Sequence, residues 1–228
     1  MTRLKPTIAL ALLTAGCNVV TTIKEVRSGD LEYVPPTATT ATSNTDVVDK
    51  PFEILWEAAA AVFNGPSFRN VHQDKAGGVI TATHLGNPLP YVDCGLVEAS
   101  LKKFLHSSKS SFAGAAAYEG YEAWSDSGLV VIKRWMSLQS TIKLRFEKTG
   151  PGQTRLTADV GYVVTREVHT RAASAKEYET FLDSISFNSG ELASFPPGDD
   201  GRSLDCRPTG KLEVQVLSLV AAHADGRR

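Results

Sequence analysis

The chain has 228 residues, of which 42% are hydrophobic, and this length and composition suit one folded domain with additional segments. The 24 basic and 25 acidic residues give a formal net charge of −1, and lysine and arginine do not gather in a run or stripe. Because a nucleic-acid-binding surface needs concentrated positive charge, the composition argues against DNA or RNA as a partner.

The first sixteen residues have the layout of a secretory signal peptide. Arg3 and Lys5 give it a positive start, an apolar run extends from Thr7 to Leu13, and small residues precede Cys17. The apolar run is much shorter than the ~20 residues that a membrane-spanning helix needs. We therefore expect residues 1–16 to be removed, and we exclude them from the fold.

The residues before the first cysteine, LLTAGC, resemble the lipobox of bacterial lipoproteins, although Thr14 stands where that family usually has leucine. The resemblance implies that Cys17 carries lipid, including palmitate, and that Asn18 directs the protein to the outer membrane, anchored on its periplasmic face. Several acyl chains would make a durable anchor, since each buried methylene contributes ~0.8 kcal/mol. The alternative is an ordinary signal peptide that is cleaved nearby, with Cys17 incidental.

Residues 17–46 are expected to be the lipidated N-terminus and a flexible tether. Their run VPPTATTATSNT is rich in Thr, Ala, Pro and Ser and has no apolar period, so it cannot bury enough surface to order itself. The alternative is that part of residues 19–34, which contain VVTTIKEV and LEYV, adds an early strand.

Residues 47–224 are expected to form a single α+β domain that begins with a helix over residues 51–64. Asp49 can cap this helix, Pro51 suits its first turn, and Gly65-Pro66 ends it. Its apolar residues recur at helical spacing and form one stripe, which consists of Phe52, Leu55, Trp56, Ala59 and Phe63.

Strands are predicted next. Residues 67–84 read as a hairpin around the turn-forming DKAGG, residues 129–135 as a strand, and residues 137–148 and 154–165 as a long hairpin around TGPGQ. In the long hairpin, apolar and polar residues alternate, as in antiparallel strands with one buried and one solvent-exposed face. Its expected inward residues are Leu138, Ile142, Leu144, Phe146, Leu156, Ala158, Val160, Tyr162 and Val164.

The C-terminal part gives weaker patterns. Residues 175–182 are interpreted as a short helix, residues 184–190 as a strand, and residues 209–224 as a final helix with one apolar face. The expected fold is therefore α+β: an antiparallel sheet of about four to five strands packed on an N-terminal and a C-terminal helix, in a helix-grip-like arrangement.

The helix FEILWEAAAAVF followed by DKAGGVITAT resembles the domains of the BamC family of outer-membrane lipoproteins, over about residues 47–165. In that family too, a helix precedes a hairpin whose Gly-x-Ile turn leads into the second strand. The resemblance implies a helix-grip fold and a place among outer-membrane lipoproteins, and it carries no catalytic role to any residue.

Cys94 and Cys206 are the two cysteines left beside Cys17 after export. An even pair in an oxidising compartment predicts a disulfide, which would join the final helix and its preceding loop to the sheet. The alternative is a reactive thiol, which would need a nearby base, and no histidine is close to either cysteine in sequence.

The sequence shows few signs of a catalytic or metal-binding site. The five histidines show no zinc spacing, and the chain has neither a nucleophile elbow nor a phosphate-binding loop. His72 and His84 could face each other across the first hairpin, but such a surface pair is more often incidental. We expect no enzymatic activity, no cofactor and no metal site.

Residues 107–128 are rich in small residues yet contain Phe112, Tyr118, Tyr121 and Trp124. Aromatic side chains with small neighbours are typical of adaptable contact surfaces, so these four are candidates for partner binding. The alternative is a long excursion whose aromatic side chains pack back onto the sheet.

Three functions follow from these features. The first is a non-enzymatic envelope lipoprotein whose periplasmic domain binds another envelope component, such as the outer-membrane assembly machinery or a cell-wall-associated partner. The second is a carrier of a lipid or small apolar ligand, held in a groove between sheet and helix. The groove would be lined by Trp56, Phe63, Ile142, Leu144, Phe146 and Tyr162. The third is an enzyme, which would need a cleft with a polar cluster.

Overall fold

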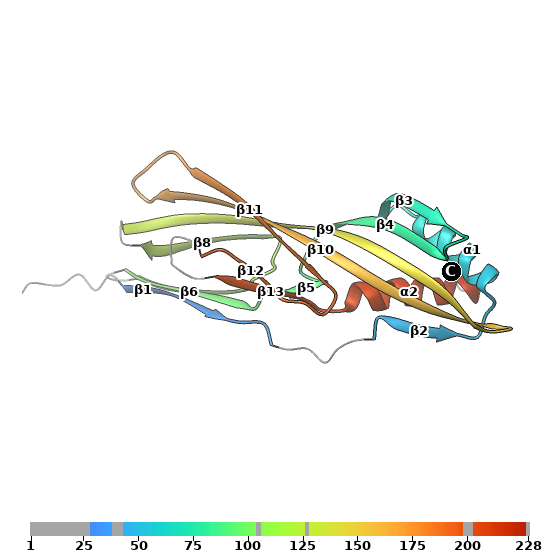
Figure 1. Ribbon diagram of the computed structural model, residues 1–228. Helices are drawn as coiled ribbons and strands as arrows, with labels where there is room; N and C mark the ends of the chain where they lie inside the picture. Colours follow the sequence, from blue (N-terminus) through green and yellow to red (C-terminus); the bar gives the residue numbers. More distant parts are fainter. Residues whose placement is uncertain (1–27, 38–42, 104–105, 126–127, 198–202, 227–228) are drawn as a thin grey trace, which may run out of the picture.

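The computed structural model describes residues 28–37, 43–103, 106–125, 128–197 and 203–226. Within them the chain is an elongated set of antiparallel strands with both helices towards one end (Figure 1), so the α+β class is confirmed. The elements are β1 (Ser28–Val34), β2 (Thr45–Val48), α1 (Phe52–Phe63), β3 (Phe68–Asp74), β4 (Val79–Gly86), β5 (Val92–Asp93), β6 (Leu96–Lys103), β7 (His106–Ala113), β8 (Tyr118–Ser125), β9 (Gly128–Gly150), β10 (Gln153–Ala172), β11 (Glu179–Asn188), β12 (Ala193–Phe195), β13 (Leu204–Pro208) and α2 (Lys211–Ala224).

Strands β9 and β10 form a hairpin that runs along most of the molecule (Figure 1). The hairpin pairs Thr154 with Lys148 near its turn and Ala172 with Val130 at its far end. The predicted long hairpin is therefore confirmed. The strand expected at residues 129–135 is not separate, because it is the first part of β9.

The neighbours of this hairpin change along its length. On β9, residues 138–145 pair with β4 and residues 128–135 pair with β8. On β10, residues 154–157 pair with β2 and residues 161–170 pair with β11. In the described part of the chain the main sheet has seven strands, more than the four to five that the sequence predicted.

These changes divide the main sheet into two halves. The helix-covered half contains β2, β3, β4 and hairpin residues 137–164. The distal half contains β8, hairpin residues 128–136 and 165–172, and residues 179–184 of β11. The two halves share the β9–β10 hairpin, so they are continuous.

The helices pack on one face of the helix-covered half and on each other (Figure 1). All five residues of the apolar stripe on α1 are buried, and so are all nine residues predicted to point inward from the hairpin. The rings of Trp56 and Phe146 lie 5.2 Å apart at this contact. Burial of each such side chain stabilises the fold by about 1.5–3 kcal/mol.

The same face of the distal half is covered by a second sheet, β1–β6–β7. Phe112 on β7 contacts Tyr121 on β8, with 5.1 Å between the ring centres, and Arg134 on β9 donates a hydrogen bond of 3.4 Å to the carbonyl oxygen of Ala113. A third sheet, β12–β13–β5, also packs on this face, where Arg166 lies over the ring of Phe195. We call the opposite face of the main sheet the outer face.

Two segments differ from the prediction. Residues 107–128 contain most of β7 and all of β8 instead of a long excursion. Their serine-rich and small-residue sequence hides the alternation that marks strands. The helix predicted at residues 175–182 is wrong, because this segment leads into β11, which pairs with residues 161–170 of β10. Long-range pairing overrides a short local helical pattern here.

The predicted tether is also corrected in part. Residues 28–34 form β1, which pairs with β6, so the early strand kept as an alternative is present. Residues 45–48 form β2 at the edge of the main sheet. Cys17 and the expected signal peptide lie outside the described residues.

The structure brings Cys94 and Cys206 together as a disulfide, with 2.06 Å between the two sulfur atoms, as predicted. Cys94 lies between β5 and β6, and Cys206 lies on β13, just before α2. Both side chains are buried. The bridge therefore joins the strand that leads into α2 to the segment that leads into the β1–β6–β7 sheet.

Candidate functional site

The outer face differs between the two halves. In the helix-covered half, β9 presents exposed polar residues from Thr141 to Glu147, and the neighbouring strands add the exposed aliphatic residues Val47, Leu85 and Val163. In the distal half, the strand register instead places aromatic and aliphatic residues on this face. They include Tyr118, Trp124, Leu129, Val131, Trp135 and Leu182. Two of these are largely open to solvent, because Tyr118 is 51% exposed and Leu182 is 69% exposed.

Four rings form a row across the strands of the distal half, which we call the aromatic row. Tyr118 lies 5.1 Å from Trp135, Trp135 lies 4.7 Å from His169, and His169 lies 6.3 Å from Tyr178, between ring centres. The rings come from β8, β9, β10 and the segment before β11. Such cross-strand contacts hold the side chains in fixed positions on the sheet.

The register explains how the row forms. Tyr118 lies directly opposite Trp135, whereas the residue opposite Trp135 on β10 is Glu167. Trp135 reaches diagonally to His169, two residues further along, which is within the range of a large aromatic side chain. Glu167 is therefore left beside Trp135, with its Oε1 atom 2.7 Å from Nε2 of His169.

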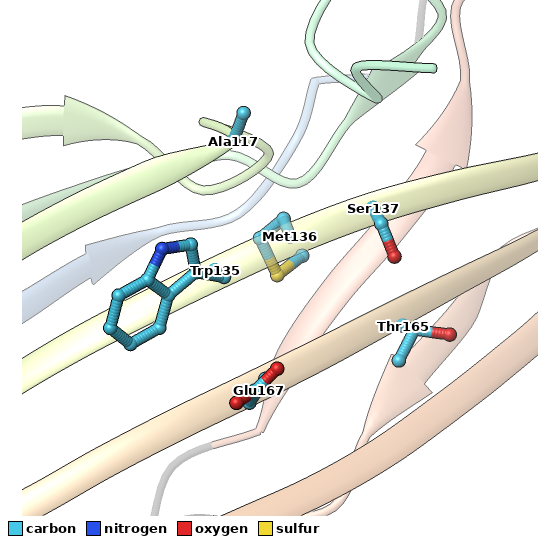
Figure 2. Close-up of a pocket in the computed structure, with 6 residues that line it drawn as sticks. All are labelled: Ala117, Trp135, Met136, Ser137, Thr165 and Glu167. Carbon is cyan, nitrogen blue, oxygen red and sulfur yellow. The ribbon is translucent and has the colours of Figure 1, made fainter. Parts of the chain in front are cut away.

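A hollow of about 380 Å³ lies beside Trp135 on the outer face (Figure 2). It occurs where the edge partner of β9 changes, because the amide of Met136 donates to the carbonyl oxygen of Ala117 while pairing with β4 begins at Leu138. Figure 2 shows that β9 and β10 supply most of its lining. The lining residues are Ala117, Trp135, Met136, Ser137, Thr165 and Glu167.

The charges near the aromatic row are mixed. The ammonium of Lys133 and the guanidinium of Arg171 lie over the ring of Tyr178, at 4.9 and 5.3 Å from its centre. The interaction with Arg171, and to a smaller extent that with Lys133, lowers the pKa of the Tyr178 phenol. Glu167 is the acidic residue that lines the hollow. The hollow thus combines an aromatic wall, two hydroxyl groups and one carboxylate.

The structure separates the four residues proposed from sequence. Tyr118 and Trp124 lie on the outer face, opposite Trp135 and Leu129 respectively. Phe112 and Tyr121 lie between the two sheets instead, and Phe112 is buried. Residues three apart in a strand fall on opposite faces, so a three-residue interval cannot form one surface. Phe112 and Tyr121 therefore pack against the sheet, as the alternative held, and partner binding stays a prediction for Tyr118 and Trp124.

Sequence reasoning missed Trp135, His169, Tyr178 and Glu167. Their meeting depends on the register of β8, β9, β10 and β11, which is set by pairing between distant segments. One signal was available. In residues 137–148 the odd-numbered residues, such as Thr141 and Lys143, form the solvent-exposed face of the strand. Trp135 is also odd-numbered, so the same alternation places it on that face.

The residues expected to line a carrier groove are all buried and belong to the hydrophobic core. Trp56 and Phe146 are in ring contact, and Tyr162 stacks on Phe187 at 5.5 Å. The hollow described above is lined by other residues, and a second one, of about 230 Å³, lies at the β3–β4 turn beside Phe52 and Phe146. The packing between helices and sheet therefore gives the carrier hypothesis no support.

One polar cluster is buried in this core. The hydroxyl of Tyr162 donates to Oε2 of Glu213 at 2.8 Å, and the hydroxyl of Ser189 donates to Oε1 of Glu213 at 2.6 Å. Burial raises the pKa of Tyr162, and the neighbouring Glu213 adds to this effect. Because both carboxylate oxygens accept hydrogen bonds, the cluster is a structural connection between β10, the turn after β11 and α2.

The described residues contain no group of three or more His, Cys, Asp and Glu side chains that could hold a metal ion. No helix in the described ranges has the length and apolar character needed to cross a membrane. Comparison of the chain with protein-family models, with curated proteins and with solved structures finds no match. The surface chemistry of the distal half is therefore the main guide to function.

Proposed function

We propose that this protein is a non-enzymatic envelope lipoprotein whose folded region binds another envelope component through the outer face of the distal half. The observation that carries the proposal is the aromatic row on this face, which runs through Tyr118 and Trp135, together with the exposed Leu182 on the same face. Aromatic residues are enriched at binding surfaces, where they give a large contact area with little loss of conformational freedom.

The proposed anchor adds a geometric constraint. Lipid on Cys17 would be only eleven residues before Ser28, where β1 begins, and an extended chain spans at most about 3.6 Å per residue. Strand β1 belongs to the sheet that covers the distal half. The anchor would therefore hold the start of β1 within about 40 Å of the outer membrane.

A helix-grip relationship to the BamC family is part of the same proposal. Its support is the order of α1 and the β3–β4 hairpin, with Gly78 at the end of the turn. Gly78 has a φ of 65°, and a Cβ atom there would lie 2.8 Å from the carbonyl oxygen of Phe146, so glycine is needed at this position. By this analogy, the outer-membrane assembly machinery is a candidate partner beside cell-wall-associated components.

Site-specific photo-crosslinking in the bacterium that makes the protein tests the proposed surface. A photoreactive amino acid is placed at Tyr118 or Leu182, and at the exposed Thr141 as the control on the helix-covered half of the same face. After irradiation, insoluble cell wall is separated from solubilised proteins. We expect covalent products from Tyr118 and Leu182 in one of these fractions, and none from Thr141. Equal products from all three positions, or none, would contradict the proposal.

The anchor has its own test. Radioactive palmitate should label the wild-type protein, and Cys17→Ser should remove the label, because the substitution deletes the only proposed attachment point. Equal labelling of the two proteins would rule out lipidation at this cysteine.

A further inference from the structure

We propose that the hollow beside Trp135 binds a pyranose ring of a cell-wall glycan strand of β-1,4-linked N-acetylhexosamines. This inference rests on the proposed function and names the class of partner for its surface. The hollow combines the ring of Trp135 with the hydroxyls of Ser137 and Thr165 and the carboxylate of Glu167 (Figure 2).

The chemistry of these groups matches that of a sugar. One face of a pyranose ring presents C–H groups, which pack on an aromatic ring whose face carries negative partial charge. The hydroxyl and amide groups at the rim of the sugar need hydrogen-bond partners. Ser137 can donate or accept. The Thr165 hydroxyl lies 2.9 Å from that of Ser184, and Oε1 of Glu167 lies 2.7 Å from Nε2 of His169, so each of these two groups offers its remaining lone pairs as acceptors. The volume, about 380 Å³, is at the low end of the range for ligand sites and suits one substituted ring.

The charges around the hollow have both signs, so neither an anionic nor a cationic ligand is uniformly favoured. Glu167 lines the hollow and would repel a phosphate, which disfavours phosphorylated sugars and phospholipid headgroups. Lys133 and Arg171 lie over Tyr178 at the end of the aromatic row and would repel a cationic ligand. A neutral ligand with one apolar face and several hydrogen-bonding groups remains, and an N-acetylhexosamine has this character.

The position of the hollow also suits a strand rather than a single sugar. Trp135 belongs both to the hollow and to the aromatic row, which continues through His169 to Tyr178. A glycan with one ring in the hollow can therefore extend over neighbouring aromatic side chains. The proposed anchor would hold this face on the periplasmic side of the membrane, where cell-wall glycan is accessible.

Binding is tested with the full chain purified in detergent. The probes are isolated cell-wall sacculi, in a sedimentation assay, and the β-1,4-linked tetramer of N-acetylglucosamine, in a calorimetric titration. Trp135→Ala should weaken tetramer binding by about tenfold through loss of ring contact, and Glu167→Gln by about fivefold through loss of a charged acceptor. Thr141→Ala, on the helix-covered half of the same face, should bind as the wild type does.

Several outcomes would overturn the inference. They are no binding of the wild type to sacculi or tetramer, or equal binding by Thr141→Ala, Trp135→Ala and Glu167→Gln. Circular dichroism establishes that each variant is folded, and Glu167→Gln decides the matter if Trp135→Ala is not. A third outcome is Trp135-dependent binding of a Cys17→Ser chain to phosphatidylethanolamine–phosphatidylglycerol vesicles without sacculus binding, which would assign the face to lipid.

The crosslinking experiment separates this inference from the proposed function. Products from Tyr118 in the cell-wall fraction would agree with both. Products that appear only among the solubilised proteins would contradict the glycan inference and leave the proposed function in place. Absence of products in both fractions would contradict the proposed function itself.

Discussion

Glu213 is an acidic side chain buried in the core, and its two carboxylate oxygens accept hydrogen bonds from Tyr162 and Ser189. A buried carboxylate is tolerated only when its oxygens have partners, since desolvation of the charge is otherwise unfavourable. The cluster joins the central hairpin to α2, so these residues contribute to stability and to the position of the C-terminal helix.

Tyr162→Phe should therefore lower the free energy of unfolding by about 1–3 kcal/mol, because it leaves one oxygen of Glu213 without its donor. Urea denaturation at neutral pH measures the change. Tyr118→Phe is the matched control, because that tyrosine is largely exposed, and it should have little effect. Equal losses in the two variants would show that the buried hydrogen bond is not the cause.

Phe112 and Tyr118 were both predicted to bind a partner, but Phe112 lies between the two sheets and Tyr118 lies on the outer face. Substitution of each by alanine distinguishes the two environments. Phe112→Ala should reduce stability by about 3–5 kcal/mol, because it opens a cavity between the two sheets. Tyr118→Ala should reduce it by no more than about 1 kcal/mol, the value of one exposed aromatic contact. Thermal and urea unfolding provide the comparison, and the reverse order of stabilities would contradict the assignment of faces.

At the scale of elements, the disulfide closes a long covalent loop between β5 and α2. Cys94 and Cys206 are 112 residues apart, and loop-closure entropy gives a stabilisation of up to about 4–5 kcal/mol. We expect reduction to shift the urea midpoint of the wild type downwards, whereas a Cys94→Ser, Cys206→Ser double variant should be indifferent to reductant. An unchanged midpoint, after thiol titration has shown both cysteines to be free, would contradict a stabilising role.

The elements that the sequence predicted well are those with strong local periodicity. Helix α1 has a complete apolar stripe, and the β9–β10 hairpin has strict alternation, so both were found with the correct inward residues. Strand β7 was missed because it is serine-rich. Only the second part of β11, from residue 184, was predicted, because the strand begins in a segment with helical spacing. These segments form strands because they pair with β6 and β10, and local sequence patterns do not reveal such pairing between segments.

At the scale of the whole molecule, the main sheet is asymmetric. One face is covered successively by the helices, by β12–β13–β5 and by β1–β6–β7 (Figure 1). The other face carries the aromatic row in its distal half. The sequence indicated four aromatic candidates for partner binding, and the structure places two of them, Tyr118 and Trp124, on the outer face. The hollow could not be predicted from the sequence, because it forms where the strand paired with β9 changes from β8 to β4.

The central claim is that an envelope component covers the outer face of the distal half. Hydroxyl-radical footprinting of the full chain, in isolated envelopes and in detergent, tests this claim most directly. The method measures the solvent exposure of individual side chains through their oxidation. Exposed apolar residues away from this face, Ile54 on α1 and Leu219 on α2, serve as internal controls. We predict that oxidation of Tyr118 and Leu182 falls in envelopes while that of the controls does not. Equal oxidation of Tyr118 and Leu182 in the two preparations would contradict the account.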